Sequence, residues 1–367
     1  MAGRDEDRDG PGDAPGPREP LPADVPPEAG AGIDLASVNW SDLDESVLDE
    51  YILGAPREFT RDEVIAAAEL DPEEAHRLWR SLGFPDSGPD ERVYTRLDVE
   101  AAKTVAAMSS QWLPDAGVRE AVARAVAQSM SRLAEWQVGM LAQIVAAHVD
   151  ELHPRGAARL AAEVLPELEQ MQSYVWRRHL AATASRFIAG VQQSDPDTIA
   201  ADTWPLSVGF ADMVGFTRTT RRRSMDELGE MIERFAVVTT EVIANGRGRI
   251  IKTVGDEVLF VTEHPADAAA IALGLRNRVR SEPSLPQLRI GLAHGMVLTR
   301  YGDVYGEVVN LAARLTSQAR PDTVLVDREV ADVLSDDPRY ELRRLPSQNT
   351  RGYAHLKAWA LRAAREG

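Results

Sequence analysis

Two aspartates that accompany apolar runs are the residues in this chain best suited to catalysis. Asp212 ends the run 206–211, and Asp256 lies 44 positions later, in a tight turn within 250–260. Carboxylate oxygens are the ligands that Mg²⁺ and Mn²⁺ prefer, and such ions hold and activate substrate phosphates. Each aspartate alone is more typical of an ordinary turn than of a metal site, so the prediction of a metal site requires a fold that brings the two together.

Other polar residues extend this candidate site. The turn 213–217 leads into a predicted helix, and free backbone N–H groups at such a turn can hold phosphate oxygens, which makes Phe216 and Thr217 candidates for substrate binding. Asn310 and Arg314 are four positions apart and therefore share one face of a predicted helix. On its own, that pair is more typical of a polar surface than of a site.

The elements that must position these side chains alternate between strand and helix after residue 197. The first strand, 206–211, precedes an amphipathic helix that ends near Gly246. A hairpin, a second helix and another strand follow at 249–254, 258–262, 266–279 and 288–293. This order, βαββαβ, is the ferredoxin-like arrangement of an α+β fold, in which helices cover one face of an antiparallel sheet. Because the first strand and the hairpin are neighbours in such a sheet, we expect both aspartates at one edge. Later elements are expected at 297–300, 308–319 and 323–326, and near Tyr340 and Trp359.

Residues 46–193 predict an all-α domain that precedes this sheet. Thr60 and Glu63 form a capping-box pattern, and Asp71 before Pro72 marks the start of a second short helix. The order helix, turn, helix and short link resembles a winged DNA-binding module of the MerR kind. Since the second helix matches its arginines with glutamates, a protein-interaction or sensor module is the favoured interpretation.

Two longer helices are expected next in the same region. Apolar residues recur at helical spacing from Val118 to Ile144, which predicts a long helix packed in a bundle. The run Met171–Val191 predicts a connector helix that leads toward the residues 194–367. We therefore expect a helical domain joined to the second domain by a helix.

Composition limits the classes of function. The net charge of −17 argues against a nucleic-acid partner, because binding to phosphates depends on clustered Lys and Arg. The chain has no cysteine, which excludes disulfides, zinc–thiolate sites and a cysteine nucleophile. Residues 1–45 hold twelve acids and three arginines with many prolines and glycines, which predicts a disordered acidic tail. No run approaches the ~18 apolar residues of a membrane helix, so we expect a cytoplasmic protein with no integral membrane segment.

Three segments within 205–361 resemble one known family. They are Phe210–Thr217, Lys252–Glu257 and Gly302–Arg314. All three resemble the class III nucleotide cyclases, specifically actinobacterial adenylate cyclases with a helical N-terminal regulatory domain. The residues 51–55 and 174–178 resemble the regulatory part of the same family. The implied organisation is a tail over 1–45, a regulatory domain with its connector over 46–193, and a catalytic domain of the class III cyclase type over 194–367.

The resemblance implies a reaction and the groups that carry it. Asp212 and Asp256 are expected to hold two Mg²⁺ or Mn²⁺ ions per active site. Asn310 is expected to orient the ribose, and Arg314 to stabilise phosphate charge in the transition state. The implied reaction converts ATP to 3′,5′-cyclic AMP and pyrophosphate.

The resemblance also implies how the base is recognised. Lys252 and Asp303 correspond to the pair that binds adenine in the family. An ammonium donor and a carboxylate acceptor complement the ring acceptor and the amino group of adenine. Guanylate cyclases of the family typically have a different pair, so ATP is the expected substrate.

Assembly and control follow from the same resemblance. In this family the metal aspartates come from one subunit, and the other four functional residues come from its partner. The chain carries all six, which implies a homodimer with two equivalent sites and an inactive monomer. Movement of one catalytic domain relative to the other would dismantle both sites, so the N-terminal domain is the expected control element. Some relatives with this layout respond to pH or fatty acids, which makes a proton or a lipid the expected class of effector.

Two other functions remain alternatives. A diguanylate cyclase shares the βαββαβ core, but the segment 254–258 lacks the doubled glycine that lets a guanine nucleotide approach. The other alternative is a DNA-binding or effector-sensing regulator whose cyclase-like half is only a sensor. The acidity of the chain and the full set of six residues both weigh against it.

Overall fold

The computed structural model describes residues 50, 52–113, 115–147, 154–193, 202–221, 223–346, 348–350 and 353–364. The predicted acidic tail, residues 1–45, lies outside these residues. Among the helices of the described part, none combines the length and the apolar character of a membrane span.

Five helices whose bounds are fully described lie before the sheet. They are α2 (Arg61–Ala67), α3 (Pro72–Ser81), α4 (Arg96–Gln111), α5 (Ala116–Ala147) and α6 (Pro154–Gln193). The predicted caps are confirmed, because Thr60 and Glu63 form a capping box and the Asp71 carboxylate accepts a hydrogen bond from the Glu74 N–H. Val64, Tyr94 and Val99 form the small core of α2–α4.

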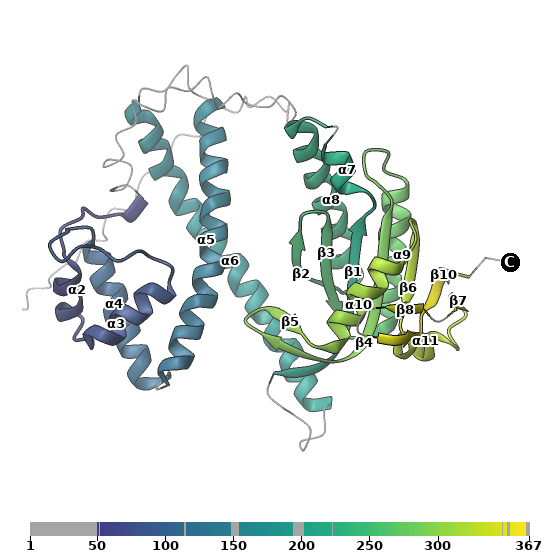
Figure 1. The fold of residues 1–367 in the computed structure, drawn as a ribbon. Helices are drawn as coiled ribbons and strands as arrows, with labels where there is room; N and C mark the ends of the chain where they lie inside the picture. Colours follow the sequence, from purple (N-terminus) through teal and green to yellow (C-terminus); the bar gives the residue numbers. More distant parts are fainter. Residues whose placement is uncertain are drawn as a thin grey trace, which may run out of the picture.

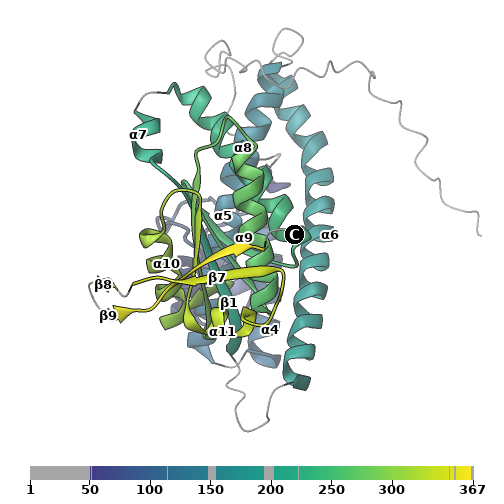
Figure 2. The ribbon, with the colours of Figure 1, turned by 90° about the vertical axis from the view of Figure 1, so that its right-hand side faces the viewer.

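The two long helices extend further than their apolar patterns indicated. The helix α5 begins at Ala116, and α6 begins at Pro154 rather than near Met171. Figures 1 and 2 both show α6 as a continuous helix that reaches from the N-terminal helices to the sheet. It contains Pro166, although a proline in the sequence usually predicts the end of a helix.

An eight-stranded sheet carries the candidate site. Its order is β2-β3-β1-β4-β6-β10-β7, with β5 paired to β4. The strands are β1 (Thr203–Met213), β2 (Arg249–Val254), β3 (Glu257–Thr262), β4 (Leu288–Arg300), β5 (Asp303–Tyr305), β6 (Thr323–Val326), β7 (Tyr340–Arg344) and β10 (Trp359–Ala363). The expected βαββαβ core is therefore present, with β1 between the β2–β3 hairpin and β4. The two expected strands 288–293 and 297–300 are a single strand, β4.

Helices cover both faces of this sheet, so the expectation of one covered face was wrong. The larger core lies under α8 (Met225–Asn245), α9 (Pro265–Arg280) and α11 (Arg328–Leu334), and α10 (Glu307–Gln318) packs on a second core on the other face. The reason lies in β1, where Phe210 faces one core and Ala211 the other. A strand that is apolar on both sides must be covered on both sides.

The remaining elements are short. The helix α7 (Phe216–Thr220) follows β1, and the strands β8 (Gln348–Thr350) and β9 (Tyr353–Leu356) form a separate hairpin. The helix α7 follows the turn 213–217, as predicted, whereas the short hairpin of β8 and β9 was not predicted.

Candidate active site

The two aspartates predicted to hold metal ions lie side by side at one end of the sheet. Asp212 is buried near the end of β1 and pairs in register with Glu257 of β3. Asp256 occupies the β2–β3 turn after Gly255, whose φ of 59° suits glycine, and the Asp256 carbonyl accepts a hydrogen bond from the Met213 N–H at 3.0 Å. The fold thus brings together two residues that the sequence separates by 44 positions.

The electrostatics of this corner are those of a carboxylate cluster. Burial raises the pKa of Asp256, and the charge and hydrogen bond of Asp212 raise this pKa further. Burial also raises the pKa of Glu257, with smaller contributions from Asp212 and Asp256. Grouped negative charge at a half-buried site favours a cation.

Arg289 places a positive charge beside these carboxylates, and the sequence patterns did not identify it as a site residue. It lies on β4 directly opposite Asp212, and its Nε donates a hydrogen bond to Asp212 Oδ2 at 3.0 Å while a second guanidinium nitrogen contacts the same oxygen. The available signal was an arginine inside the apolar run 288–293. A charge placed in a buried strand usually has a partner.

The donor set at this corner fits a hydrated divalent cation. Within the described residues, no three His, Cys, Asp or Glu side chains are grouped as a complete metal cage. Mg²⁺ is ordinarily held by one or two carboxylates together with water and substrate phosphates, so Asp212 and Asp256 suffice for that coordination. Three neighbouring carboxylates against one guanidinium leave charge for such an ion to neutralise.

The segment after Asp212 forms the expected turn and helix. Gly215 adopts φ 78° as the residue before α7, and Phe216 begins the helix with its ring against the larger core. Thr217 follows in the first turn. The first N–H groups of any helix lack partners inside it, so the backbone here is suited to phosphate oxygens.

Lys252 and Asp303 form an ion pair. The Lys252 ammonium on β2 donates to Asp303 Oδ2 at 2.6 Å, and Asp303 Oδ1 accepts from the Val304 N–H at 2.8 Å. The Lys252 side chain is 48% exposed and that of Asp303 is 27% exposed. The two residues expected to recognise adenine therefore lie together, with the ammonium group accessible to a ligand.

Asn310 and Arg314 lie on α10, as expected. Asn310 is exposed and Arg314 is half-buried, whereas Ala312 between them is fully buried. The buried side of α10 is fixed closely to the sheet, because the Thr316 hydroxyl donates to the carbonyls of Phe210 and Ala312. The helix thus presents Asn310 outward from a rigid support.

Comparisons with known proteins identify the family of the chain. The family described as the adenylate and guanylate cyclase catalytic domain matches residues 200–363. A protein named adenylate cyclase from Streptomyces coelicolor is 41% identical over 293 residues, which cover 78% of this chain and 74% of that protein. An adenylate cyclase from Glutamicibacter nicotianae is 34% identical over 373 residues, which cover 95% of this chain and 92% of that protein. Among solved structures, the adenylyl cyclase CyaB from P. aeruginosa matches with a TM-score of 0.40 and 20% identity, over 44% of this chain and 96% of that one.

Proposed function

This chain belongs to the class III nucleotide cyclases and is an adenylate cyclase, and from that premise we propose that it works as a homodimer with two shared active sites. In each site Asp212 and Asp256 come from one copy. Lys252, Asp303, Asn310 and Arg314 come from the other. The reaction converts ATP to 3′,5′-cyclic AMP and pyrophosphate.

The surface around Lys252 carries the dimer proposal. The strands β2, β4 and β5 and the β4–β5 turn, to which the Lys252–Asp303 pair belongs, carry large side chains that are widely exposed in the single chain, namely Val254 (64%), Met296 (55%), Leu298 (38%), Tyr301 (59%) and Tyr305 (48%). A soluble monomer rarely exposes so many apolar residues in one region, whereas a protein interface buries them. A second copy on this surface would bring its own aspartate corner against the first copy's Lys252 and Asp303.

Each residue has a role that its chemistry supports. Lys252 donates to a ring nitrogen of adenine and Asp303 accepts from its amino group, so ATP replaces the contact that the two make with each other. Asn310 hydrogen-bonds the ribose, and Arg314 directs the N–H donors of its planar guanidinium group at the phosphates. When ATP binds, Arg289 can exchange part of its contact with Asp212 for a phosphate oxygen, since guanidinium groups bind phosphates strongly.

Two divalent ions complete the proposed site. Bound to Asp212 and Asp256, they would activate the ribose 3′-oxygen and neutralise the triphosphate. The chain itself holds the ribose and base in line for attack and supplies Arg314 where negative charge increases.

The reaction is tested with the purified full-length chain and ATP, in the presence of Mg²⁺ or Mn²⁺. The expected product is cyclic AMP, detected by chromatography against a standard. Absence of cyclic AMP with both ions, or full activity in Asp212→Ala, would overturn the assignment.

We further propose that residues 46–193 regulate a catalytic domain over 194–367 through α6. The contact that supports this proposal is the Phe187 ring at the end of α6, which lies 5.6 Å from the Trp204 ring at the start of β1 in an edge-on arrangement. Gly190 lies so close to Trp204 that an added Cβ would be 2.7 Å from the indole ring. Movement of α6 would therefore reach β1, the strand that carries Asp212.

The regulatory proposal is tested on two neighbouring residues of α6. Phe187→Ala removes the contact with Trp204, whereas Ile188→Ala changes an exposed side chain beside it. We expect Phe187→Ala to change the pH–activity profile of the full chain and Ile188→Ala to leave it unchanged. Identical profiles for Phe187→Ala and the unmodified chain would contradict control through this contact.

A further inference from the structure

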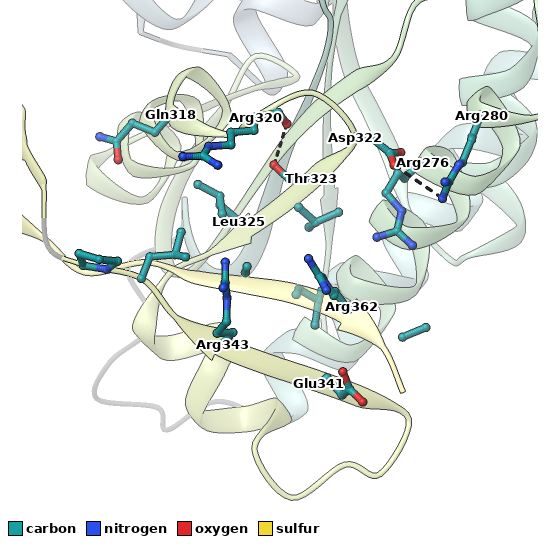
Figure 3. A pocket seen from close by; sticks show the side chains of 16 residues that line it. Arg276, Arg280, Gln318, Arg320, Asp322, Thr323, Leu325, Glu341, Arg343 and Arg362 are labelled. Atoms are coloured by element: carbon teal, nitrogen blue, oxygen red, sulfur yellow. Dashed lines mark hydrogen bonds and ion pairs between the residues drawn. The ribbon is translucent and has the colours of Figure 1, made fainter. Parts of the chain in front are cut away.

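A large hollow lies at the end of the sheet where β6 begins and β10 ends. Its volume is about 810 Å³, and side chains from α9, the end of α10, β6, β7 and β10 line it (Figure 3). This size is within the range of sites that hold small molecules. None of the six residues of the proposed active site lines it.

Strand register places two arginines on the same wall. Arg343 of β7 pairs with Ala360 of β10, and Arg362 lies two residues beyond Ala360. Residues paired across an antiparallel ladder, and residues two apart along a strand, point to one face. Figure 3 shows both side chains extending from these strands toward the space below Leu325, with Arg276 reaching in from the helix α9.

The lining is strongly basic in an acidic chain. Five arginines face two carboxylates in the hollow: Arg276, Arg280, Arg320, Arg343 and Arg362 against Asp322 and Glu341. The whole chain has a net charge of −17, so this concentration of positive charge runs against the overall composition. A local basic hollow in an acidic protein attracts small anions.

Much of this positive charge is not neutralised within the described part of the chain. Arg280 lies 3.7 Å from Asp322, and Arg276 donates to the neighbouring Asn277 side chain. The structure gives no hydrogen bond or ion pair to the guanidinium groups of Arg320, Arg343 and Arg362 among the residues it describes. Guanidinium groups that converge without partners form the arrangement that binds phosphate.

Apolar side chains complete the lining of the hollow. Leu325, Leu345 and Ala360 form an apolar floor, which a ligand made only of phosphate groups would not require.

We propose that this hollow is a second anion site, which binds a short phosphate chain as found in a nucleoside triphosphate or an inorganic polyphosphate. The arginines bind the phosphates, and the apolar floor accommodates any nucleoside attached to them. The site is separate from the catalytic groups but close to them, because Thr323 on its wall pairs in register with Arg289 and Gln318 lies one helical turn beyond Arg314. One copy of the chain forms the hollow, so binding there does not require the homodimer.

The test measures binding of inorganic tripolyphosphate to the full-length chain by calorimetry, at low salt with a metal chelator present. The double variant R343Q/R362Q removes two arginines of the hollow. The matched control R328Q/R339Q removes two exposed arginines that pair with Asp332 and Asp337 elsewhere. The variant Arg314→Ala reports binding at the proposed active site.

The expected result is saturable binding that weakens at least tenfold in R343Q/R362Q and changes less than twofold in the control and in Arg314→Ala. Arg320→Gln, with an unchanged melting temperature, should weaken binding in the same direction. Binding of cytidine triphosphate is measured in the same way to identify the type of ligand. Tighter binding of cytidine triphosphate than of tripolyphosphate indicates a nucleotide ligand, whereas equal binding indicates an inorganic phosphate chain. No binding to the unmodified chain, equal binding by citrate, or loss in Arg314→Ala but not in R343Q/R362Q would overturn the proposal.

Discussion

Lys252 Nζ lies 2.6 Å from Asp303 Oδ2, although 51 positions separate the two residues in the chain. The contact joins the β2 strand to β5, which otherwise pairs only with β4 among the described strands. It places one donor and one acceptor side by side on an accessible surface. In the proposed function, this pair selects adenine.

Lys252→Met should lower kcat/KM for ATP about 100-fold, or ~2.7 kcal/mol, because a site built to hydrogen-bond its substrate loses a donor. Stability should change little, since exposed ion pairs contribute about 1 kcal/mol or less. The matched control is Lys357→Met, an exposed lysine outside the site. Steady-state kinetics that give equal kcat/KM for the two variants would remove Lys252 from substrate recognition.

Arg289→Met should lower stability by roughly 1–3 kcal/mol, because the buried Asp212 loses its hydrogen-bonded partner. The variant should also gain more in melting temperature from added Mg²⁺ than the unmodified chain gains, since the ion then supplies the missing positive charge. Arg328→Met, which removes the exposed pair with Asp332, is the control. An equal Mg²⁺ response in all three proteins would argue against a metal at Asp212.

Gly291→Ala should impair both stability and turnover. An added Cβ would lie 2.4 Å from the backbone nitrogen of Thr316 and 2.5 Å from the carbonyl oxygen of Ala312, so α10 would have to move. Overpacking of this kind costs about 1–3 kcal/mol, and displacement of Asn310 and Arg314 should lower kcat.

The control for this substitution is Gly229→Ala on α8, where an added Cβ meets nothing within 4 Å. That change should be neutral or stabilise by up to about 1 kcal/mol, through helix propensity. Urea denaturation and kcat measurements on both variants decide the matter. A Gly291→Ala protein as stable and as active as the control would show that α10 is not held closely at this point.

Asp327→Asn should flatten the pH dependence of stability. Burial raises the pKa of Asp327 to about 6, although backbone N–H groups of Val330 and His294 bond to it. A folded-state pKa above the unfolded one means that the folded protein binds the proton more tightly. The stabilisation from this proton is complete below the unfolded pKa and is lost as the pH rises through 6.

The expected difference can be measured as the free energy of unfolding at pH 5 and pH 7. Between these values the unmodified chain should lose about 1 kcal/mol more than Asp327→Asn. The asparagine keeps an oxygen for the cap of α11, so the helix should persist. Parallel profiles would mean that Asp327 is not titrating in this range.

Local patterns predicted the elements that carry their own signal. The apolar run of β1, the Ser224-capped helix α8 and the β2–β3 hairpin all occur where periodicity and turn residues placed them. The topology then brought Asp212 and Asp256 together, because a βαββαβ order makes their strands neighbours. These parts follow from short-range chemistry and a common arrangement of strands.

Contacts between distant segments could not be predicted from the sequence. The pairing of Arg289 with Asp212 depends on the register of β4 against β1, which no local pattern specifies. The same holds for the second covered face of the sheet and for the arginines of the hollow, which come from separate elements. The length of α6 was underestimated for a different reason, because Pro166 lies inside the helix and does not end it.

The central claim is that each active site takes residues from two copies of the chain, and subunit mixing tests it most directly. Asp212→Asn and Arg314→Ala should each be inactive alone. Mixed in equal amounts under conditions where subunits exchange, half of the dimers carry both changes on different copies, and each of these has one intact site. We predict recovery of about a quarter of the unmodified activity, measured as cyclic AMP formed per total protein. No recovery, in a mixture whose heterodimers are demonstrated by mass spectrometry, would contradict the shared site.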